Sequence, residues 1–334
     1  MSPDEPRSDG GDATVESGSD ASPPTLEPLS VEAASDLIED VVDNVERVIV
    51  GKRDAVEHIV VAVLAGGHVL LEDVPGTGKT MLARSVATSV DASFRRVQFT
   101  PDLLPADVTG VNVYNQKTGE FEFQPGPVFA NVVLADEINR APPKTQSALL
   151  EAMEEGQVTV DGETRQLPQP FAVIATQNDV ETGRTYELPM AEIDRFAKKL
   201  RLGYPEREQE AEIIGRTAGH HPIEELEPVT DGESLRRARE TVSDVRLGEP
   251  VRNYISRLAE YTRNHAQLGV SPRGSIALAR TAQVRAILAG REYVTPDDVQ
   301  AEAPTVFSHR IRPRTGSETG DDVVSAALSS VGVE

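Results

Sequence analysis

Residues 70–80, LLEDVPGTGKT, constrain the fold of this chain more strongly than any other stretch. An apolar run, HVLL, leads into the glycine-bearing turn, and a helix-like run, MLARSVATSV, follows it. A strand, a loop and a helix in this order form the context that a phosphate-binding loop requires. The sequence therefore predicts an α/β fold in which a phosphate group is held at the start of a helix.

The chemistry of this loop depends on two glycines and on the two residues that open the helix. Gly76 and Gly78 allow backbone N–H groups to turn inward around phosphate oxygens. Lys79 is expected to reach the β- and γ-phosphates, and the Thr80 hydroxyl to bind Mg²⁺. The predicted nucleotide-binding residues of the loop are Gly76, Thr77, Gly78, Lys79, Thr80 and Met81. Asp73 stands where the pattern G-x-x-x-x-G-K-[ST] has its first glycine, a position that opens the turn. The alternative is a glycine turn that binds nothing.

Acidic residues dominate the charge of the chain. Its 334 residues include 55 Asp and Glu against 33 Lys and Arg, which gives a formal net charge of −22. An acidic, lysine-poor surface over an ordinary apolar pattern resembles proteins from a salt-saturated cytoplasm, so we expect a halophilic protein. The same charge argues against nonspecific nucleic-acid binding. The absence of cysteine excludes disulfides, thiol nucleophiles and zinc–thiolate sites.

The hydropathy pattern predicts a cytoplasmic protein without a membrane span. The longest apolar run, at residues 59–65, is too short to cross a bilayer. Residues 1–30 are rich in Ser, Pro, Asp, Glu and Gly. This composition predicts a disordered acidic tail rather than a signal peptide.

Two domains are predicted after this tail. Residues 31–204 mix strand and helix patterns, whereas residues 205–334 have helical patterns. Two hairpins are expected in the first domain, at residues 111–123 and 157–167. Two apolar runs, at residues 131–135 and 171–176, have the composition of strands buried on both faces of a parallel sheet. Residues 196–202 are expected to form the last strand of this domain. Helices are expected at residues 31–48, 53–65, 206–217, 233–245, 251–266, 272–289 and 296–303.

Two carboxylates follow the apolar run at residues 131–135. Asp136 is expected to hold Mg²⁺ together with Thr80, directly or through water. Glu137 is expected to polarise an attacking water as general base. An Asp-Glu pair alone is usually the solvated start of a loop, but after a phosphate-binding loop in an α/β chain it indicates nucleotide hydrolysis.

Longer motifs resemble those of the MoxR family of AAA+ ATPases. Residues 131–155, NVVLADEINRAPPKTQSALLEAMEE, resemble the corresponding stretch of that family. So do VQFTPDLLPADVTG, QPGPVFA, GQVTVDGE and FAVIATQN, and the similarity extends from about residue 48 to residue 306. The resemblance implies an AAA+ P-loop NTPase core at residues 31–204 and a small all-helical lid domain at residues 205–334.

The resemblance also implies roles for residues outside the loop. Asn178 matches sensor 1, which orients the attacking water, and Arg195 matches the arginine finger, which acts on the nucleotide of a neighbouring subunit. Arg273 matches sensor 2 on the lid helix. Val50 and Gly51 match the place where the adenine packs. Each role has an alternative, since Asn178 could cap a turn, Arg195 could form an ion pair within the chain, and Arg273 could be a surface residue in a first helical turn.

The chain departs from the family at positions beside these motifs. Family members commonly have proline after the sensor asparagine, where this chain has Asp179. Met190 stands where the family has Glu after Leu-Pro. Both changes lie beside the expected subunit interface, so they put subunit contacts in doubt more than hydrolysis.

The resemblance implies a Mg²⁺-dependent ATPase that works as a ring, with a hexamer expected. Its expected task is that of a chaperone that remodels or matures a protein partner, one with a von Willebrand factor A domain among the candidates. Two other functions stay open. One is a nucleic-acid motor or a magnesium-chelatase-like subunit, and the other is a nucleotide-gated scaffold with little turnover.

Overall fold

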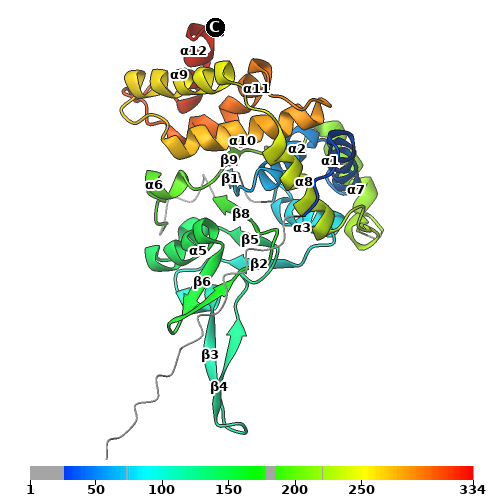
Figure 1. Ribbon diagram of the computed structural model, residues 1–334. Coiled ribbons are helices and arrows are strands. Elements are labelled where there is room, and N and C mark those ends of the chain that lie inside the picture. The colour runs from blue at the N-terminus through cyan, green and yellow to red at the C-terminus, as the bar shows by residue number, and fades with distance from the viewer. Residues whose placement is uncertain (1–25, 73, 75, 178–184, 220, 334) are drawn as a thin grey trace, which may run out of the picture.

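The computed structural model describes residues 26–72, 74, 76–177, 185–219 and 221–333. Most of the predicted acidic tail, and the predicted site residue Asn178, lie outside the described residues, as do Asp73 and Asp179. A helical layer and a hairpin layer lie on opposite sides of a central sheet (Figure 1). Among the described residues, no helix combines the length and the apolar character that a membrane span requires.

Five parallel strands form the central sheet, in the order β2-β5-β8-β1-β9. Their bounds are β1 (Val69–Glu72), β2 (Phe94–Gln98), β5 (Val132–Asp136), β8 (Ala172–Gln177) and β9 (Lys198–Leu200). The predicted α/β fold with a parallel sheet is therefore confirmed. The predicted strand at residues 196–202 is shorter than expected, because only three of its residues pair with β1.

Alternate residues of the central strands pack on opposite faces of the sheet. Leu71 and Leu134 lie in an apolar cluster with α1 (Val31–Glu46), α2 (Arg53–Leu64) and α3 (Lys79–Ser89). Leu70 and Val133 lie in a second cluster on the other face, with α5 (Pro143–Glu155). Burial on both faces explains why these strands appear in the sequence as continuous apolar runs instead of alternating ones.

Two hairpins project from the core on the side opposite the lid (Figure 1). The first pairs β3 (Gly110–Asn115) with β4 (Glu120–Pro125) and follows the short helix α4 (Pro105–Thr109). The second pairs β6 (Gln157–Val160) with β7 (Glu163–Gln166). Both were predicted. The turn of the second is Asp161-Gly162, with φ of 52° and 86°, the left-handed conformation that an Asp-Gly hairpin turn uses.

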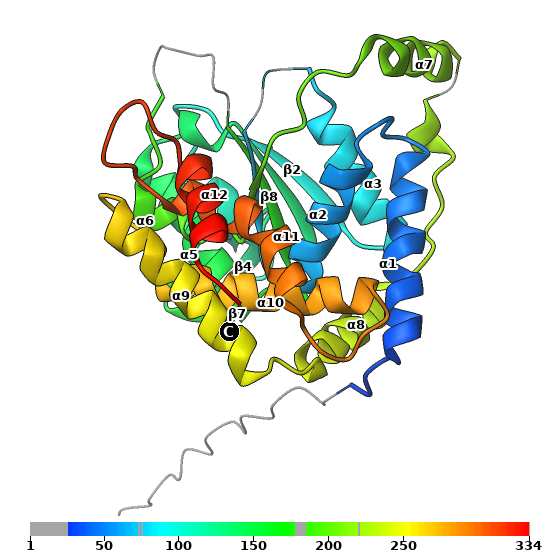
Figure 2. The ribbon, with the colours of Figure 1, turned by 90° about the horizontal axis from the view of Figure 1, so that it is seen from above.

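The chain after β9 is helical, as predicted. Its helices are α7 (Arg207–Thr217), α8 (Gly232–Asp244), α9 (Glu249–His265), α10 (Pro272–Leu288), α11 (Pro296–Phe307) and α12 (Gly320–Ser330). The last of these was not predicted. α7 lies apart from the other lid helices, at the C-terminal end of α1 (Figure 2), where Arg216 donates to the carbonyls of Glu46 and Arg47. The expected domain boundary at residue 205 falls between β9 and α7.

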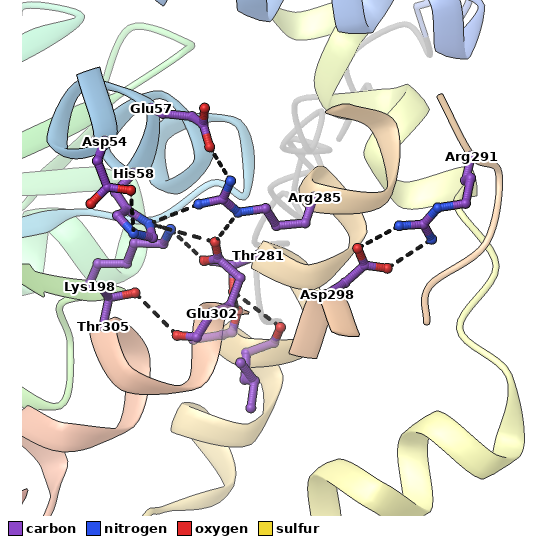
Figure 3. Close-up of polar contacts among 12 residues, drawn as sticks. Asp54, Glu57, His58, Lys198, Thr281, Arg285, Arg291, Asp298, Glu302 and Thr305 are labelled. Carbon is purple, nitrogen blue, oxygen red and sulfur yellow. Dashed lines mark hydrogen bonds and ion pairs between the residues drawn. The ribbon is translucent and has the colours of Figure 1, made fainter. Parts of the chain in front are cut away.

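A buried cluster of charged residues joins the lid to the edge of the sheet (Figure 3). Lys198 on β9 and Glu302 on α11 form an ion pair, and both side chains are 0% exposed. Lys198 Nζ also donates to His58 Nδ1 of α2 at 2.8 Å. Arg285 on α10 donates to Glu302 at 2.5 Å and ion-pairs with Glu57 on α2. Burial, together with the charge of Lys198, lowers the pKa of His58 to about 4, so its ring is neutral and can accept that hydrogen bond.

Candidate nucleotide-binding site

The loop between β1 and α3 has the backbone conformation that a phosphate-binding loop needs. Gly76 and Gly78 have φ of 85° and 86°, and Gly78 immediately precedes the first residue of α3. A Cβ atom at either position would meet no heavy atom within 4 Å, so backbone strain rather than crowding favours glycine there. The backbone N–H groups of the first turn of α3 lie at a helix N-terminus, where an anion is stabilised.

Lys79 is 8% exposed and lies against its own loop. Its Nζ donates to the Val74 carbonyl at 2.7 Å, and the Thr77 hydroxyl donates to the same carbonyl at 3.3 Å. A neutral carbonyl is a weaker partner for an ammonium group than a phosphate oxygen is. A bound phosphate would therefore compete well for this lysine.

The carboxyl end of β5 presents the two predicted acidic residues. Asp136 accepts hydrogen bonds from the Thr176 hydroxyl at 2.6 Å and from Arg96 Nη2 at 2.6 Å. Glu137 has φ of 56°, which turns its side chain out of the strand direction. Glu137 Oε2 accepts from Gln98 Nε2 at 2.6 Å and from Arg140 Nη1 at 2.9 Å.

One cavity of about 590 Å³ brings the loop and the acidic pair together. Its lining residues are Gly76, Thr77, Gly78, Lys79, Thr80, Met81, Arg96, Gln98, Asp136, Glu137 and Arg140. All six residues predicted for the loop and both predicted carboxylates thus share one cavity. The space lies at the carboxyl ends of parallel strands, the usual ligand position in an open α/β sheet.

Arg96, Gln98 and Thr176 were not predicted as site residues. Gln98 pairs with Asp136 in the register of β2 and β5, so the ends of the two strands lie side by side. Thr176 lies near the end of β8, the neighbour of β5 on its other side. Polar residues at the carboxyl ends of the expected parallel strands were the signal that could have identified them.

The residues expected to hold Mg²⁺ fit that ion. Thr80 and Asp136 line the same cavity and offer a hydroxyl and a carboxylate oxygen, the ligand types that Mg²⁺ prefers. Within the described part of the chain, no cluster of three His, Cys, Asp or Glu side chains is placed to hold a metal. A single carboxylate is sufficient, because protein-bound Mg²⁺ commonly takes its other ligands from phosphate and water.

Val50 and Gly51 precede α2 and do not line this cavity. Gly51 has φ of 67°, and a Cβ atom there would lie 2.3 Å from the Gln209 side chain of α7. The adenine position therefore stays a prediction. Asn178, the predicted sensor, is the residue after Gln177 in the sequence and lies outside the described residues.

Arg195 and Arg273 also lie outside the cavity of the chain that carries them. Both instead form ion pairs with Glu154 on α5, Arg195 at 3.3 Å. The intrachain ion pair considered for Arg195 is thus present, and the first turn of α10 places Arg273 beside α5 instead of over the phosphate-binding loop. The sensor 2 role of Arg273 therefore stays a prediction.

Comparisons with known proteins agree with this geometry. Residues 68–198 match the ATPase family associated with various cellular activities (AAA), and residues 258–327 match the AAA lid domain. The chain is 56% identical to the uncharacterised protein YeaC of Bacillus subtilis, over 81% of this chain and 85% of that one. It is 41% identical to chaperone MoxR1 of Mycobacterium tuberculosis, over 87% of this chain and 79% of that one. A crystal structure of an ATPase candidate from Cytophaga hutchinsonii superposes with a TM-score of 0.85 at 36% identity, over 91% of this chain and 97% of that one.

Proposed function

The chain belongs to the MoxR family of AAA+ ATPases, and we propose that it hydrolyses ATP with Mg²⁺ as a ring oligomer that remodels or matures partner proteins. The observation that carries the proposal is the cavity shared by Lys79, Thr80, Asp136 and Glu137. These residues belong to two segments far apart in the sequence. Groups that bind phosphate and groups that activate water, arranged around one cavity, are what a nucleoside triphosphatase needs.

The phosphate-binding half of the site is the loop and the first turn of α3. Backbone N–H groups and Lys79 hold the phosphate oxygens, and Lys79 exchanges the Val74 carbonyl for the γ-phosphate. Thr80 and Asp136 are the residues that would hold Mg²⁺, which would neutralise phosphate charge when bound. Arg96 donates to one oxygen of Asp136 and would have to release that oxygen for it to bind the ion.

The water-activating half of the site is Glu137. Its carboxylate takes a proton from water as the water oxygen bonds to the γ-phosphorus, and the bond from that phosphorus to the β,γ-bridging oxygen breaks to release ADP. Gln98 and Arg140 both donate to Oε2 and so fix the orientation of the carboxylate. Asn178 is the proposed residue that orients the same water.

A ring, with six subunits as the proposed number, adds positive charge from a neighbouring subunit at the γ-phosphate position. Arg195 and Arg273 are 29% and 44% exposed, so a neighbouring copy can reach them. An arginine supplied by a neighbour stabilises the charge that develops in the transition state, by about 10³–10⁵ in rate in other phosphoryl-transfer enzymes. Hydrolysis then depends on assembly.

The proposed client is a protein, with a von Willebrand factor A domain as the candidate module, and the proposed location is the cytoplasm. The hairpin of β3 and β4 exposes Tyr114 and Phe121, whose rings contact each other at 5.4 Å. Exposed aromatic side chains suit protein contacts. A net charge of −22 opposes a polyanion such as nucleic acid.

Turnover measured against protein concentration tests the ATPase proposal. Activity per chain should rise with the fraction of rings seen by sedimentation in the same buffer, and chelation of Mg²⁺ should abolish it. Arg195→Ala should still assemble but lose at least about 100-fold in turnover. Activity that is constant across the assembly transition would contradict the ring mechanism, and negligible turnover in assembled rings would favour the nucleotide-gated scaffold.

The client proposal needs a separate test. Glu137→Gln should bind ATP without cleaving it, and therefore retain a client. Capture from a lysate in molar KCl, with Lys79→Ala as the matched control that does not bind ATP, should enrich a protein with a von Willebrand factor A domain only on the Glu137→Gln chain. Enrichment of nucleic acid instead, or equal capture by both variants, would contradict the proposed client class.

A further inference from the structure

Two arginines from different parts of the fold meet at one carboxylate, that of Glu154 near the end of α5. Arg195 comes from the core, two residues after α6 (Met190–Ile193), and its Nη2 lies 3.3 Å from Glu154 Oε2. Arg273 comes from the first turn of lid helix α10, and its Nη2 ion-pairs with Glu154 Oε1. Each guanidinium therefore uses one oxygen of the same carboxylate, and the two like charges lie side by side.

A second carboxylate, that of Asp194, joins the two backbone segments that carry these arginines. Asp194, next to Arg195 in the sequence, accepts hydrogen bonds from the Ser271 hydroxyl at 2.8 and 3.0 Å. Ser271 is the N-cap of α10 and precedes Arg273 by two residues. Arg310, which is buried, donates to Asp194 at 2.9 Å. The start of α10 and the segment that carries Arg195 are thus held together independently of Glu154.

The arginine pair retains hydrogen-bonding capacity for another anion. A guanidinium has five N–H donors, and each arginine is seen to contact Glu154 through a single nitrogen. Two guanidinium groups and one carboxylate leave a net charge of +1 at this place. Without Glu154, the two like charges would repel and move apart.

We propose that Glu154 is a positioning residue. It holds Arg195 and Arg273 as one guanidinium pair, and this pair contacts the triphosphate of the ATP bound to a neighbouring copy. This inference rests on the proposed function, because it requires a ring in which arginines act in trans. Glu154 touches no phosphate itself. It sets the spacing and orientation of the two cations, and a misplacement of about 1 Å in such groups costs roughly 100-fold in rate.

Mixed rings separate this role from any effect of Glu154 on its own cavity. A donor chain carries Glu137→Gln, so its own site is inactive while its arginines are intact. A receiver chain carries Arg195→Ala, so its own site is complete but it supplies no finger to its neighbour. Turnover in the mixture then comes only from receiver sites that lie beside a donor. Glu154→Gln is introduced into the donor alone, and Glu151→Gln, an exposed carboxylate on the same helix, is the matched control.

We expect Glu154→Gln in the donor to lower kcat at the receiver sites about tenfold or more, with the KM for ATP changed by less than about threefold. The split arises because ATP in the ground state is held by the loop of the receiver, whereas the arginine pair stabilises the transition state. Glu151→Gln should leave both constants within about twofold. Glu154→Asp, which keeps the charge on a shorter side chain, should lie between wild type and Glu154→Gln. Sedimentation and thermal unfolding of the donor should be unchanged, which excludes a fold defect.

Three results would overturn the inference. Unchanged turnover with the Glu154→Gln donor, in a mixture where the parent donor complements the receiver, would remove the role of Glu154 and leave the trans arginine intact. Increased turnover would show that Glu154 competes with phosphate instead of positioning the pair. A mixture of the parent donor and receiver without turnover would overturn the trans arginine of the proposed function, and this inference with it.

Discussion

Two lysines with little solvent exposure carry out opposite tasks in this molecule. Lys79, in the nucleotide cavity, is 8% exposed and donates to a backbone carbonyl at the mouth of its loop. Lys198, at the edge of the sheet, is 0% exposed and is surrounded by Glu302 and His58, with Arg285 bonded to the same glutamate. Burial lowers the pKa of Lys198 to about 8, although Glu302 opposes that shift.

The comparison shows that burial alone does not identify a functional charge. What differs is whether the partners are exchangeable. The contact of Lys79 with a carbonyl can be replaced by phosphate from the solvent side of an open cavity. The partners of Lys198 come from two domains and are themselves buried, so a ligand would have to break the contact between lid and core. Lys79 is available for chemistry, whereas Lys198 holds the lid in place.

The largest expected effect is that of Lys79→Met on turnover. Removing one preorganised charge from the phosphates should lower kcat/KM for ATP by about 100-fold or more. The melting temperature should change little, because Lys79 lines an open cavity and does not join the lid to the sheet. Steady-state kinetics checks the loss of kcat/KM, and thermal unfolding of the same sample checks the melting temperature. A large loss of stability would contradict the contrast between the two lysines.

Lys198→Met should have the opposite effect: a large loss of stability and little change in turnover. It leaves the Glu302 carboxylate buried with one cation removed, and such a change costs about 3–5 kcal/mol in other proteins. The double variant Lys198→Met/Glu302→Gln should recover part of this loss, because it removes the uncompensated charge. Denaturant unfolding with a linear extrapolation measures the free energy of unfolding of the single and the double variant. A single variant as stable as wild type would show that the cluster does not hold the lid.

Acid should weaken the fold through a third buried group, His68. Its Nδ1 accepts from the Val173 N–H at 3.0 Å, and its Nε2 lies 3.0 Å from the Met153 carbonyl, so the neutral Nε2–H form satisfies both contacts. Burial lowers the pKa of His68 to about 4. In the unfolded chain the ring binds a proton near pH 6.5, so this contribution to stability is present above pH 6.5 and is lost as the pH falls towards 4. The loss from this group is at most about 3 kcal/mol.

His68→Gln tests that assignment, since an amide can also accept and donate. We expect it to be less stable than wild type at pH 7 but to lose less stability between pH 7 and pH 5. The free energy of unfolding across that range is the measurement. His265→Gln, on the exposed end of α9, is the control and should follow the wild-type curve. An unchanged acid dependence in His68→Gln would refute the role of this ring.

Salt should produce the smallest effect and should separate surface charge from buried charge. With a net charge of −22, the folded chain should gain a few degrees in melting temperature between dilute buffer and molar KCl. The penalty of Lys198→Met should be nearly equal in both buffers, because buried pairs are screened little. A melting temperature that does not rise with KCl would refute the expectation of a halophilic protein.

Local sequence patterns predicted most of the core correctly, for a physical reason. Strands buried on both faces must be apolar throughout, so β5 and β8 were visible as runs of hydrophobic residues. Glycines in the sequence marked the phosphate-binding loop and the turn of the second hairpin, and in the structure these glycines have positive φ. The helix α12 escaped prediction, although Thr319 and Asp322 form a capping box at its start. Its apolar residues cover the lid only because α9 and α11 lie beneath it.

The sequence by itself determined which groups can bind phosphate and activate water, because the loop at residues 76–81 and the pair Asp136-Glu137 carry their chemistry in local order. The tertiary structure alone decided which groups surround them. Gln98 reached Glu137 through the register of two parallel strands, and Arg195 and Arg273 met at Glu154 through the packing of the lid on the core. Contacts of this kind depend on how distant segments pack in three dimensions, which no local pattern of side chains encodes.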